Sequence, residues 1–340
     1  MNLDRYKNKF YDSSIKIKDN FRICAVGVGG AGSNTINRIS KFGLKGIYTI
    51  AINTDLIHLS TINADKKVHL SSSLLHGWGT GGDVELGERA IIAAQDSIKG
   101  LFNDFDIVFI IAGFGGGTGT GATPLLADLA KKAGALVVSI VSIPFSIEGA
   151  RVAKAKQGVA TLINFSQTII MLENDKLMQL IPNFPLEKAF FVMDQLISEI
   201  ILAFYNMLIP QSGININFSE IKRIFSSGKL STILFNEGEV NNIKDLVEET
   251  LNHPLIELDY SKSSDALIYI NSGEELTLSE VMEIIDSIGS KMNKRNSIIW
   301  GTSIDTTLKN NIKLLCILTN IQLPFLEVKD NSDSLNSIIN

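Results

Sequence analysis

The stretch that decides the fold is GFGGGTGTG, residues Gly113–Gly121, which directly follows the apolar run Phe105–Ala112. Five of the seven residues from Gly115 onward are glycines, and the other two are threonines. Between a strand and a helix, such a run offers backbone N–H groups and hydroxyls that suit a di- or triphosphate. It is not a P-loop, because no Gly-Lys-Ser/Thr follows, and its strand and helix neighbours argue against a flexible linker.

A second glycine run, GVGGAG at Gly27–Gly32, lies upstream and also joins a strand pattern to a helix pattern. Taken alone it allows a phosphate loop, a plain tight turn, or the loop of a dinucleotide fold with Asp55 near the place of the ribose-binding acid. A dehydrogenase has no use for a second phosphate loop as large as Gly113–Gly121. The pair of runs therefore favours a phosphate-rich nucleotide over NAD.

Around these runs, strand and helix patterns alternate. The apolar runs lack period-2 alternation, which indicates strands buried on both faces of a parallel sheet. The expected strands are Phe21–Val28, Ile47–Asn53, Phe105–Ala112, Ala135–Ser142 and Thr168–Leu172, and the expected helices are Gly32–Phe42, Val84–Ile98 and Thr123–Lys132.

A long helix pattern, Leu186–Ile209, follows and ends at Pro210. Beyond it we expect a loop and helix over Ile214–Ser226, and a second set of elements. These are strands at Lys229–Phe235, Ala266–Asn271, Ser297–Gly301 and Ile312–Thr319, and helices at Val240–Asn252 and Thr277–Ser290. The sequence thus predicts an α/β protein with a Rossmann-like, parallel-sheet nucleotide domain, a long central helix and a second, smaller α/β domain. The expected boundaries are 1–20 for an N-terminal extension, 21–185, 186–213, 214–326, and 327–340 for a disordered tail.

Composition narrows the function classes. The 340 residues carry a net charge of −5 and no long Lys/Arg-rich run, which argues against general binding to nucleic acid or anionic membrane. Residues 1–20 lack the apolar core of a signal peptide, and the apolar run Phe190–Ile209 is interrupted by Asp194, Gln195 and Glu199. We therefore expect a cytoplasmic protein without membrane insertion. The two cysteines and four scattered histidines show no ligand spacing, so we expect no metal site and place the histidines on surfaces or loops.

Both glycine runs belong to an ordered series of motifs that resembles the tubulin/FtsZ superfamily, and within it FtsZ of the archaeal branch. The series comprises GGAGSN at 29–34, INTD at 52–55, GTGGDVELG at 79–87, the Gly113–Gly121 run, PFSIEG at 144–149, NDKL at 174–177, and Ala189-Phe190 with Asp194. The resemblance covers roughly Phe21 to Leu323. It implies a GTPase that binds GTP or GDP with Mg²⁺ and polymerises head to tail, acting in the cytoplasm at the division site. Implied partners are further copies of the chain, a second FtsZ homologue and division-site proteins.

The resemblance also implies the nucleotide-binding residues: Gly29, Gly30, Ser33, Asn34, Asn53, Gly81, Gly82, Gly115, Gly116, Gly117, Thr118, Gly119, Thr120, Gly121, Pro144, Glu148, Arg151, Asn174, Phe190 and Asp194. Glu148 can accept from ribose hydroxyls, although an acid at a helix start explains it too. Asp194 can accept from the N1–H and N2–H₂ edge of guanine, which adenine does not offer. Phe190 fits either base stacking or a plain core position. Arg151 stands one residue closer to Glu148 than its counterpart in bacterial relatives.

The loop after the long helix, Gly213–Glu220, resembles the family's N-x-D-F-x-D segment, which enters the next subunit's site and positions the attacking water. Asn215 matches the pattern, while Asn217 and Glu220 replace its two aspartates. An amide can orient water but cannot take a proton. The loop is therefore compatible with working, slowed or absent hydrolysis, and also with a simple helix N-cap box. Two hypotheses follow: a polymerising GTPase, with Asn215, Asn217 and Glu220 as catalytic residues, or a GTP-binding structural or regulatory filament protein with little turnover.

Overall fold

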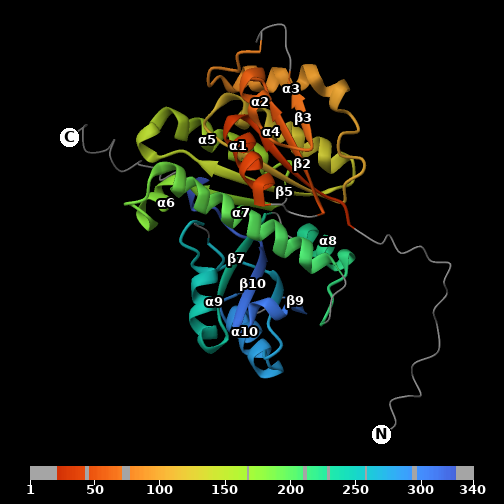
Figure 1. The fold of residues 1–340 in the computed structure, drawn as a ribbon, viewed down its shortest axis with the longest axis vertical. Helices are drawn as coiled ribbons and strands as arrows, with labels where there is room; N and C mark the ends of the chain where they lie inside the picture. Colours follow the sequence, from red (N-terminus) through yellow and green to blue (C-terminus); the bar gives the residue numbers. More distant parts are fainter. Residues whose placement is uncertain are drawn as a thin grey trace, which may run out of the picture.

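The computed structural model describes residues 21–326, except 43–45, 71–76, 167, 210–212, 228–229, 257–258 and 293–296. The expected N-terminal extension and C-terminal tail lie outside the described residues. Ten strands form one continuous sheet in the order β3-β2-β1-β4-β5-β6-β7-β10-β8-β9. The N-terminal elements lie on one side of the long helix α7 (Leu186–Leu208) and the C-terminal elements on the other (Figure 1).

The N-terminal half of the sheet is parallel throughout. Its strands are β1 (Ile23–Val28), β2 (Ile47–Asn53), β3 (Lys66–His69), β4 (Ile107–Gly113), β5 (Leu136–Ile143) and β6 (Thr168–Glu173). The helices of this half are α1 (Gly29–Ile39), α2 (Leu56–Thr61), α3 (Val84–Ile98), α4 (Gly117–Lys132), α5 (Gly149–Leu162) and α6 (Asn174–Leu180). Since the strand order reverses between β1 and β4, the carboxyl ends of these two strands mark the place where open α/β sheets bind ligands.

The C-terminal half is mixed. Strand β10 (Asn311–Thr319) pairs antiparallel with β7 (Ser231–Glu239) and β8 (Asp265–Ser272), and β8 pairs parallel with β9 (Ser297–Ile304). Helices α8 (Phe218–Ser227), α9 (Ile243–Leu251) and α10 (Leu278–Ser290) accompany these strands. Short 3-10 turns span Ser40–Phe42, Ser146–Glu148, Val240–Asn242, Thr306–Leu308 and Pro324–Leu326. Among the described residues, the two sheet halves pair at Thr168 and Ser231, whose hydroxyls lie 2.9 Å apart.

Helix α7 connects the halves. By length and composition its segment Glu187–Leu208 could cross a membrane, but α7 packs against α1 on one side and against β7 and β10 on the other. A long helix packed on both sides needs such an apolar composition to fill both contacts. The α/β architecture predicted from the sequence, with a long central helix and a C-terminal domain, is confirmed.

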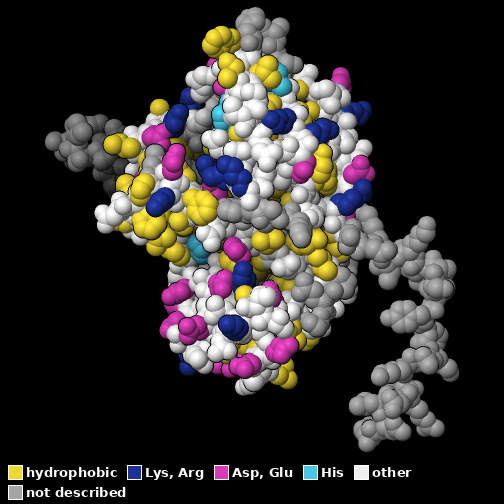
Figure 2. Space-filling view, viewed as in Figure 1, with side chains coloured by type: hydrophobic (Ala, Val, Ile, Leu, Met, Phe, Trp, Pro, Cys, Tyr) yellow, Lys and Arg dark blue, Asp and Glu magenta, His cyan; other side chains and the backbone are white. Residues whose placement is uncertain are grey.

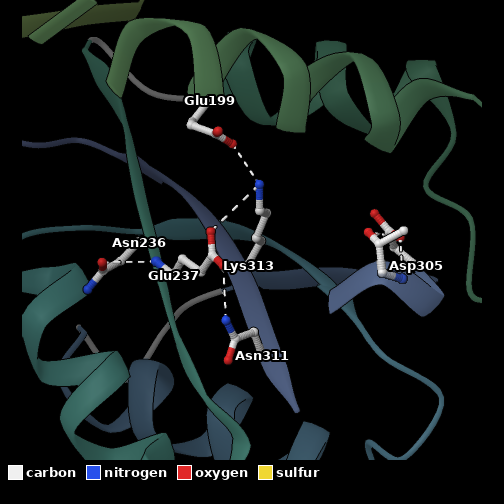
Figure 3. Close-up of polar contacts among 7 residues, drawn as sticks. Glu199, Asn236, Glu237, Asp305, Asn311 and Lys313 are labelled. Atoms are coloured by element: carbon white, nitrogen blue, oxygen red, sulfur yellow. Dashed lines mark hydrogen bonds and ion pairs between the residues drawn. The ribbon is translucent and has the colours of Figure 1, made fainter. Parts of the chain in front are cut away.

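A half-buried ion pair ties α7 to the C-terminal sheet (Figure 3). Lys313 Nζ on β10 lies 2.8 Å from Glu199 Oε2 on α7 and 3.7 Å from Glu237 Oε2 on β7. Asn311 Nδ2 donates to the other oxygen of Glu237 at 3.2 Å. Burial acts to lower the pKa of Lys313, but the two carboxylates outweigh it and raise that pKa.

The end of the described chain returns to the N-terminal half. The turn Pro324–Leu326 packs against α5, and the Lys156 ammonium lies 5.2 Å from the centre of the Phe325 ring. Phe325 and Leu326 are partly buried against the main core. This segment is therefore part of the folded body.

Candidate functional site

A cleft opens at the carboxyl ends of the parallel strands and has two connected lobes. The glycine lobe is lined by Gly30, Asn53, Thr54, Asp55, His58, Trp78, the segment 79–82, Phe114, the segment 116–119, Pro144, Glu148 and Arg151. The apolar lobe is lined by Gly32, Asn34, Thr35, Arg38, Ile111, Ala112, Ile140, Leu172, Met193, Asp194 and Ile197. Ala31, Gly113, Ser142, Asn174 and Phe190 line both, so one elongated ligand can occupy the two lobes together.

Two helices begin within the glycine runs that border the glycine lobe. Helix α1 starts at Gly29, directly after β1, and α4 starts at Gly117, inside the second glycine run. Free N–H groups at a helix start attract anions, and the helix dipole adds to that attraction. The start of α4 lies six residues before the expected one at Thr123. The glycine run is therefore half loop and half helix.

Close packing explains why the helical part of that run is glycine. A Cβ on Gly117 would overlap the carbonyl oxygen of Asp83, and one on Gly121 would overlap that of Val84. The first turns of α4 thus lie directly on the start of α3. Gly115 has φ +93°, which a side chain rarely adopts. The run serves helix packing as well as the cleft.

Fifteen of the twenty residues implied by the resemblance line the cleft: Gly30, Asn34, Asn53, Gly81, Gly82, Gly116, Gly117, Thr118, Gly119, Pro144, Glu148, Arg151, Asn174, Phe190 and Asp194. The other five, Gly29, Ser33, Gly115, Thr120 and Gly121, lie behind its wall. Gly29 approaches the backbone of Gly119, and the Thr120 hydroxyl accepts from the Gly115 N–H at 2.8 Å. These residues shape the loops that border the cleft.

A side-chain network that the sequence did not reveal supports the glycine lobe. Asn53 Nδ2 lies 3.1 Å from His58 Nδ1, and His58 Nε2 lies 2.9 Å from Asn34 Oδ1. Because an amide nitrogen only donates, this arrangement places the imidazole proton on Nε2. His58 therefore holds two of the implied ligand-binding side chains, where we had expected a surface or loop residue. The available signal was its place on α2, one turn past the INTD motif.

Several other polar side chains of the glycine lobe are hydrogen-bonded or ion-paired. Thr54 and Thr118 share a hydrogen bond of 2.6 Å between their hydroxyls. Glu148 accepts from Arg151 Nη1 at 2.8 Å and from the Phe145 N–H at 3.1 Å. Asp55 accepts from the His58 N–H at 2.9 Å and so caps α2, a structural role that accounts for an acid at this place.

The apolar lobe holds a charged pair. Asp194 on α7 is 2% exposed, and Arg38 Nε on α1 donates to its Oδ2. Burial raises the pKa of Asp194, while the charge of Arg38 and a hydrogen bond from Thr35 act to lower it. Asn174 Oδ1 is buried without a hydrogen-bond partner among the described residues. A buried polar atom of this kind is costly unless a ligand or water satisfies it, so the lobe fits a flat ligand with polar edges.

The loop that resembles the family's catalytic segment lies outside the cleft, at the far end of α7 (Figure 1). It is attached to β9, since the Ile214 N–H donates to Thr302 Oγ1 at 3.1 Å and the Thr302 N–H donates to the Ile214 carbonyl at 2.9 Å. Glu220 Oε2 accepts from the Asn217 N–H at 3.0 Å, which caps α8. Asn215 and Asn217 are exposed.

Comparison with known proteins identifies the class of protein. The model of the Tubulin/FtsZ family GTPase domain matches residues 22–182, and the model of the FtsZ family C-terminal domain matches residues 234–322. The chain is 42% identical to cell division protein FtsZ 2 of Haloferax volcanii, over 88% of the chain and 76% of the relative. It is 39% identical to FtsZ 2 of Methanocaldococcus jannaschii, over 94% and 86%.

Solved structures also resemble this chain. An FtsZ dimer of M. jannaschii has a TM-score of 0.78 at 36% identity and covers 88% of each chain. CetZ2 of H. volcanii, in a GTPγS-bound protofilament, has a TM-score of 0.78 at 17% identity, over 94% of this chain and all of CetZ2, which shows the shared fold. The chain belongs to the FtsZ family of cell division proteins.

Proposed function

We propose that this protein binds GTP in the cleft, assembles head to tail into filaments, and hydrolyses GTP where two subunits meet. The observation that carries the proposal is the position of the cleft and the loop Gly213–Glu220 at opposite ends of α7. The helix has 23 residues, which corresponds to about 34 Å. When subunits stack along this helix, the loop of one subunit reaches the cleft of the next.

The two lobes support GTP as the ligand. The starts of α1 and α4 suit a triphosphate, and Glu148 suits a ribose hydroxyl. Asn174 and Asp194 offer the amide and carboxylate that the polar edge of guanine requires. Mg²⁺ is bound mainly through the phosphates of such nucleotides, and it neutralises their charge. The segments that would border it are 81–82 and 116–119.

Exposed apolar side chains support assembly. Figure 2 shows hydrophobic side chains gathered over α6 and the start of α7, beside the cleft. Met178, Leu180 and Phe184 are each about half exposed there, and Ile214 is 46% exposed at the loop end. Patches of this kind mark protein interfaces. Contact between the two ends would remove both from water, so the occupant that we propose for each is a second copy of this chain.

Two features of the loop argue for slow hydrolysis: Asn217 is neutral, and Glu220 already accepts an N–H of its own loop. This contact favours the second candidate, a GTP-binding structural or regulatory filament protein with little turnover that shapes the cell or modulates another FtsZ homologue. In either case we place the protein in the cytoplasm at the division site, with division-site proteins as further partners.

Phosphate release measured against protein concentration separates the two candidates. For the GTPase, turnover per subunit is near zero in dilute solution and rises steeply once subunits meet, because neighbours complete the site. GDP affinity, measured in parallel, stays constant. Filaments in electron micrographs without phosphate release would select the structural protein. Turnover per subunit that is independent of concentration would contradict a shared site.

A further inference from the structure

Arg38 has no place among the residues that the sequence motifs identify, yet it lies inside the apolar lobe. It stands one helical turn after Asn34 on α1, and its Nε donates to Asp194 Oδ2. Its side chain is 35% exposed, while that of Asp194 is 3% exposed. Among the described residues that line this lobe, Arg38 and Asp194 are the two that carry charge.

The protonation state of Asp194 decides which base it recognises. A carboxylate only accepts, so it matches the N1–H and N2–H₂ donors of guanine. A carboxylic acid both donates and accepts, so it matches the N1 acceptor and N6–H₂ donor of adenine. Burial favours the neutral acid, because removing a charge from water is costly. A buried aspartate is therefore a reliable guanine reader only when something keeps it ionised.

We propose that Arg38 is the positioning residue that fixes base specificity by holding Asp194 as a carboxylate. The inference rests on the proposed GTP site and adds the residue that makes it selective. Arg38 is suited to the task because guanidinium stays protonated at all accessible pH values. Of the groups packed around Asp194, Thr35 on the same face of α1 adds a neutral hydrogen bond, and Arg38 supplies the charge.

The test measures GDP and ADP affinity against pH, from about pH 5.5 to 8. This range lies above the ordinary pKa of an aspartate, where a carboxyl with a raised pKa titrates. The protein is kept dilute to prevent assembly, and the variants are Arg38→Gln, Arg38→Lys, Asp194→Asn and the double variant R38Q/D194N. Loss of a neighbouring opposite charge raises a carboxyl pKa by about 1–3 units. In R38Q we therefore expect the loss of GDP affinity on acidification to begin about 1–3 pH units higher than in the wild type.

Below that midpoint, GDP affinity of R38Q falls about tenfold per pH unit while ADP affinity rises or holds. Arg38→Lys restores most of the wild-type profile, because an ammonium supplies the same charge. Asp194→Asn and R38Q/D194N give flat profiles, which identifies Asp194 as the titrating group. A merely structural role of Arg38 would lower GDP affinity equally at every pH.

An R38Q profile with the wild-type midpoint and the wild-type ratio of GDP to ADP affinity would overturn the inference. Failure of the proposed function has a different signature, since the wild type itself would then bind ADP as well as GDP. Thermal melting of R38Q and R38K without nucleotide confirms that the variants are folded before their profiles are compared.

Discussion

The two ends of α7 are built in different ways. At the cleft end, backbone positions set the geometry: helices α1 and α4 start at glycines, and several of these glycines touch neighbouring backbone. At the loop end, Asn215 and Asn217 are exposed side chains, and one carboxylate, Glu220, caps the next helix. The proposed nucleotide binding thus depends on close packing that tolerates little change, whereas the proposed hydrolysis depends on side-chain chemistry that can be altered without disturbing the fold.

The largest expected effect is at the loop end. Glu220→Ala should lower GTP turnover by about 10²–10⁴-fold, the usual cost of removing a positioned polar or charged group from a reaction centre. GDP affinity should not change, since in the proposed filament Glu220 acts on the nucleotide of the neighbouring subunit. Glu220→Gln separates charge from capping, because an amide oxygen still accepts the Asn217 N–H. If E220Q hydrolyses GTP like the wild type, the Glu220 carboxylate acts as a helix cap and is not a catalytic group.

One added methyl group tests the close packing at the cleft end. Gly121→Ala places a Cβ against the Val84 carbonyl and should destabilise the protein by about 1–3 kcal/mol, a typical cost of overpacking, with loss of GDP binding as α4 shifts. Gly116→Ala is the matched control in the same run, because its Cβ meets nothing within 4 Å. Urea unfolding measures both. Equal stability of the two variants would show that α4 does not depend on this contact.

The sequence predicted the elements whose local pattern agrees with the final packing. Helix Val84–Ile98 and strand Ile47–Asn53 have the predicted bounds, because their apolar spacing matches the core that they face. The start of α4 was missed, because glycine is a poor helix former and only contact with α3 explains it there. Strand β3 was missed because its lysines are exposed at a sheet edge, where charge is favoured.

The residues of the site divide in the same way, into those that a local motif predicts and those that only the fold reveals. Asn174 and Asp194 were identified through motifs, and both line the cleft. Arg38 and His58 were missed because their partners are distant in sequence: 156 residues separate Arg38 from Asp194, and 24 separate His58 from Asn34. No periodicity within α1 or α2 can reveal a contact that the sheet order creates. Only the fold brings these side chains together.

A smaller effect on GTP turnover is expected from a second substitution at the loop end. Asn217→Asp restores the negative charge that the family pattern carries, and we expect turnover to rise by about tenfold, with GDP affinity unchanged. An aspartate is as good a helix cap as asparagine, so α8 should keep its stability. Ser219→Asp, which adds the same charge two residues further on, is the control. An equal rise in both variants would indicate a general charge effect rather than a positioned water.

The smallest expected effect concerns Lys313, which ties the middle of α7 to the C-terminal sheet (Figure 3). Lys313→Met keeps the length of the side chain but leaves Glu199 and Glu237 facing each other without a cation. We expect a loss of about 1 kcal/mol in the free energy of unfolding, since the pair is only partly shielded from solvent. Lys291→Met removes an ion pair with Glu248 that is about half exposed, and its cost should be smaller than that of Lys313→Met.

The stabilisation by Lys313 depends on pH, and its direction follows from the shifted pKa. The pKa of Lys313 is raised in the folded protein, so its contribution to stability is fully present below the pKa of an unfolded lysine and is lost as pH rises through the folded value. The difference between wild type and Lys313→Met should therefore be constant near neutral pH and shrink only above about pH 10. Urea unfolding at neutral and alkaline pH measures it. Equal losses for Lys313→Met and Lys291→Met at neutral pH would mean that α7 is held against the C-terminal sheet by apolar packing alone.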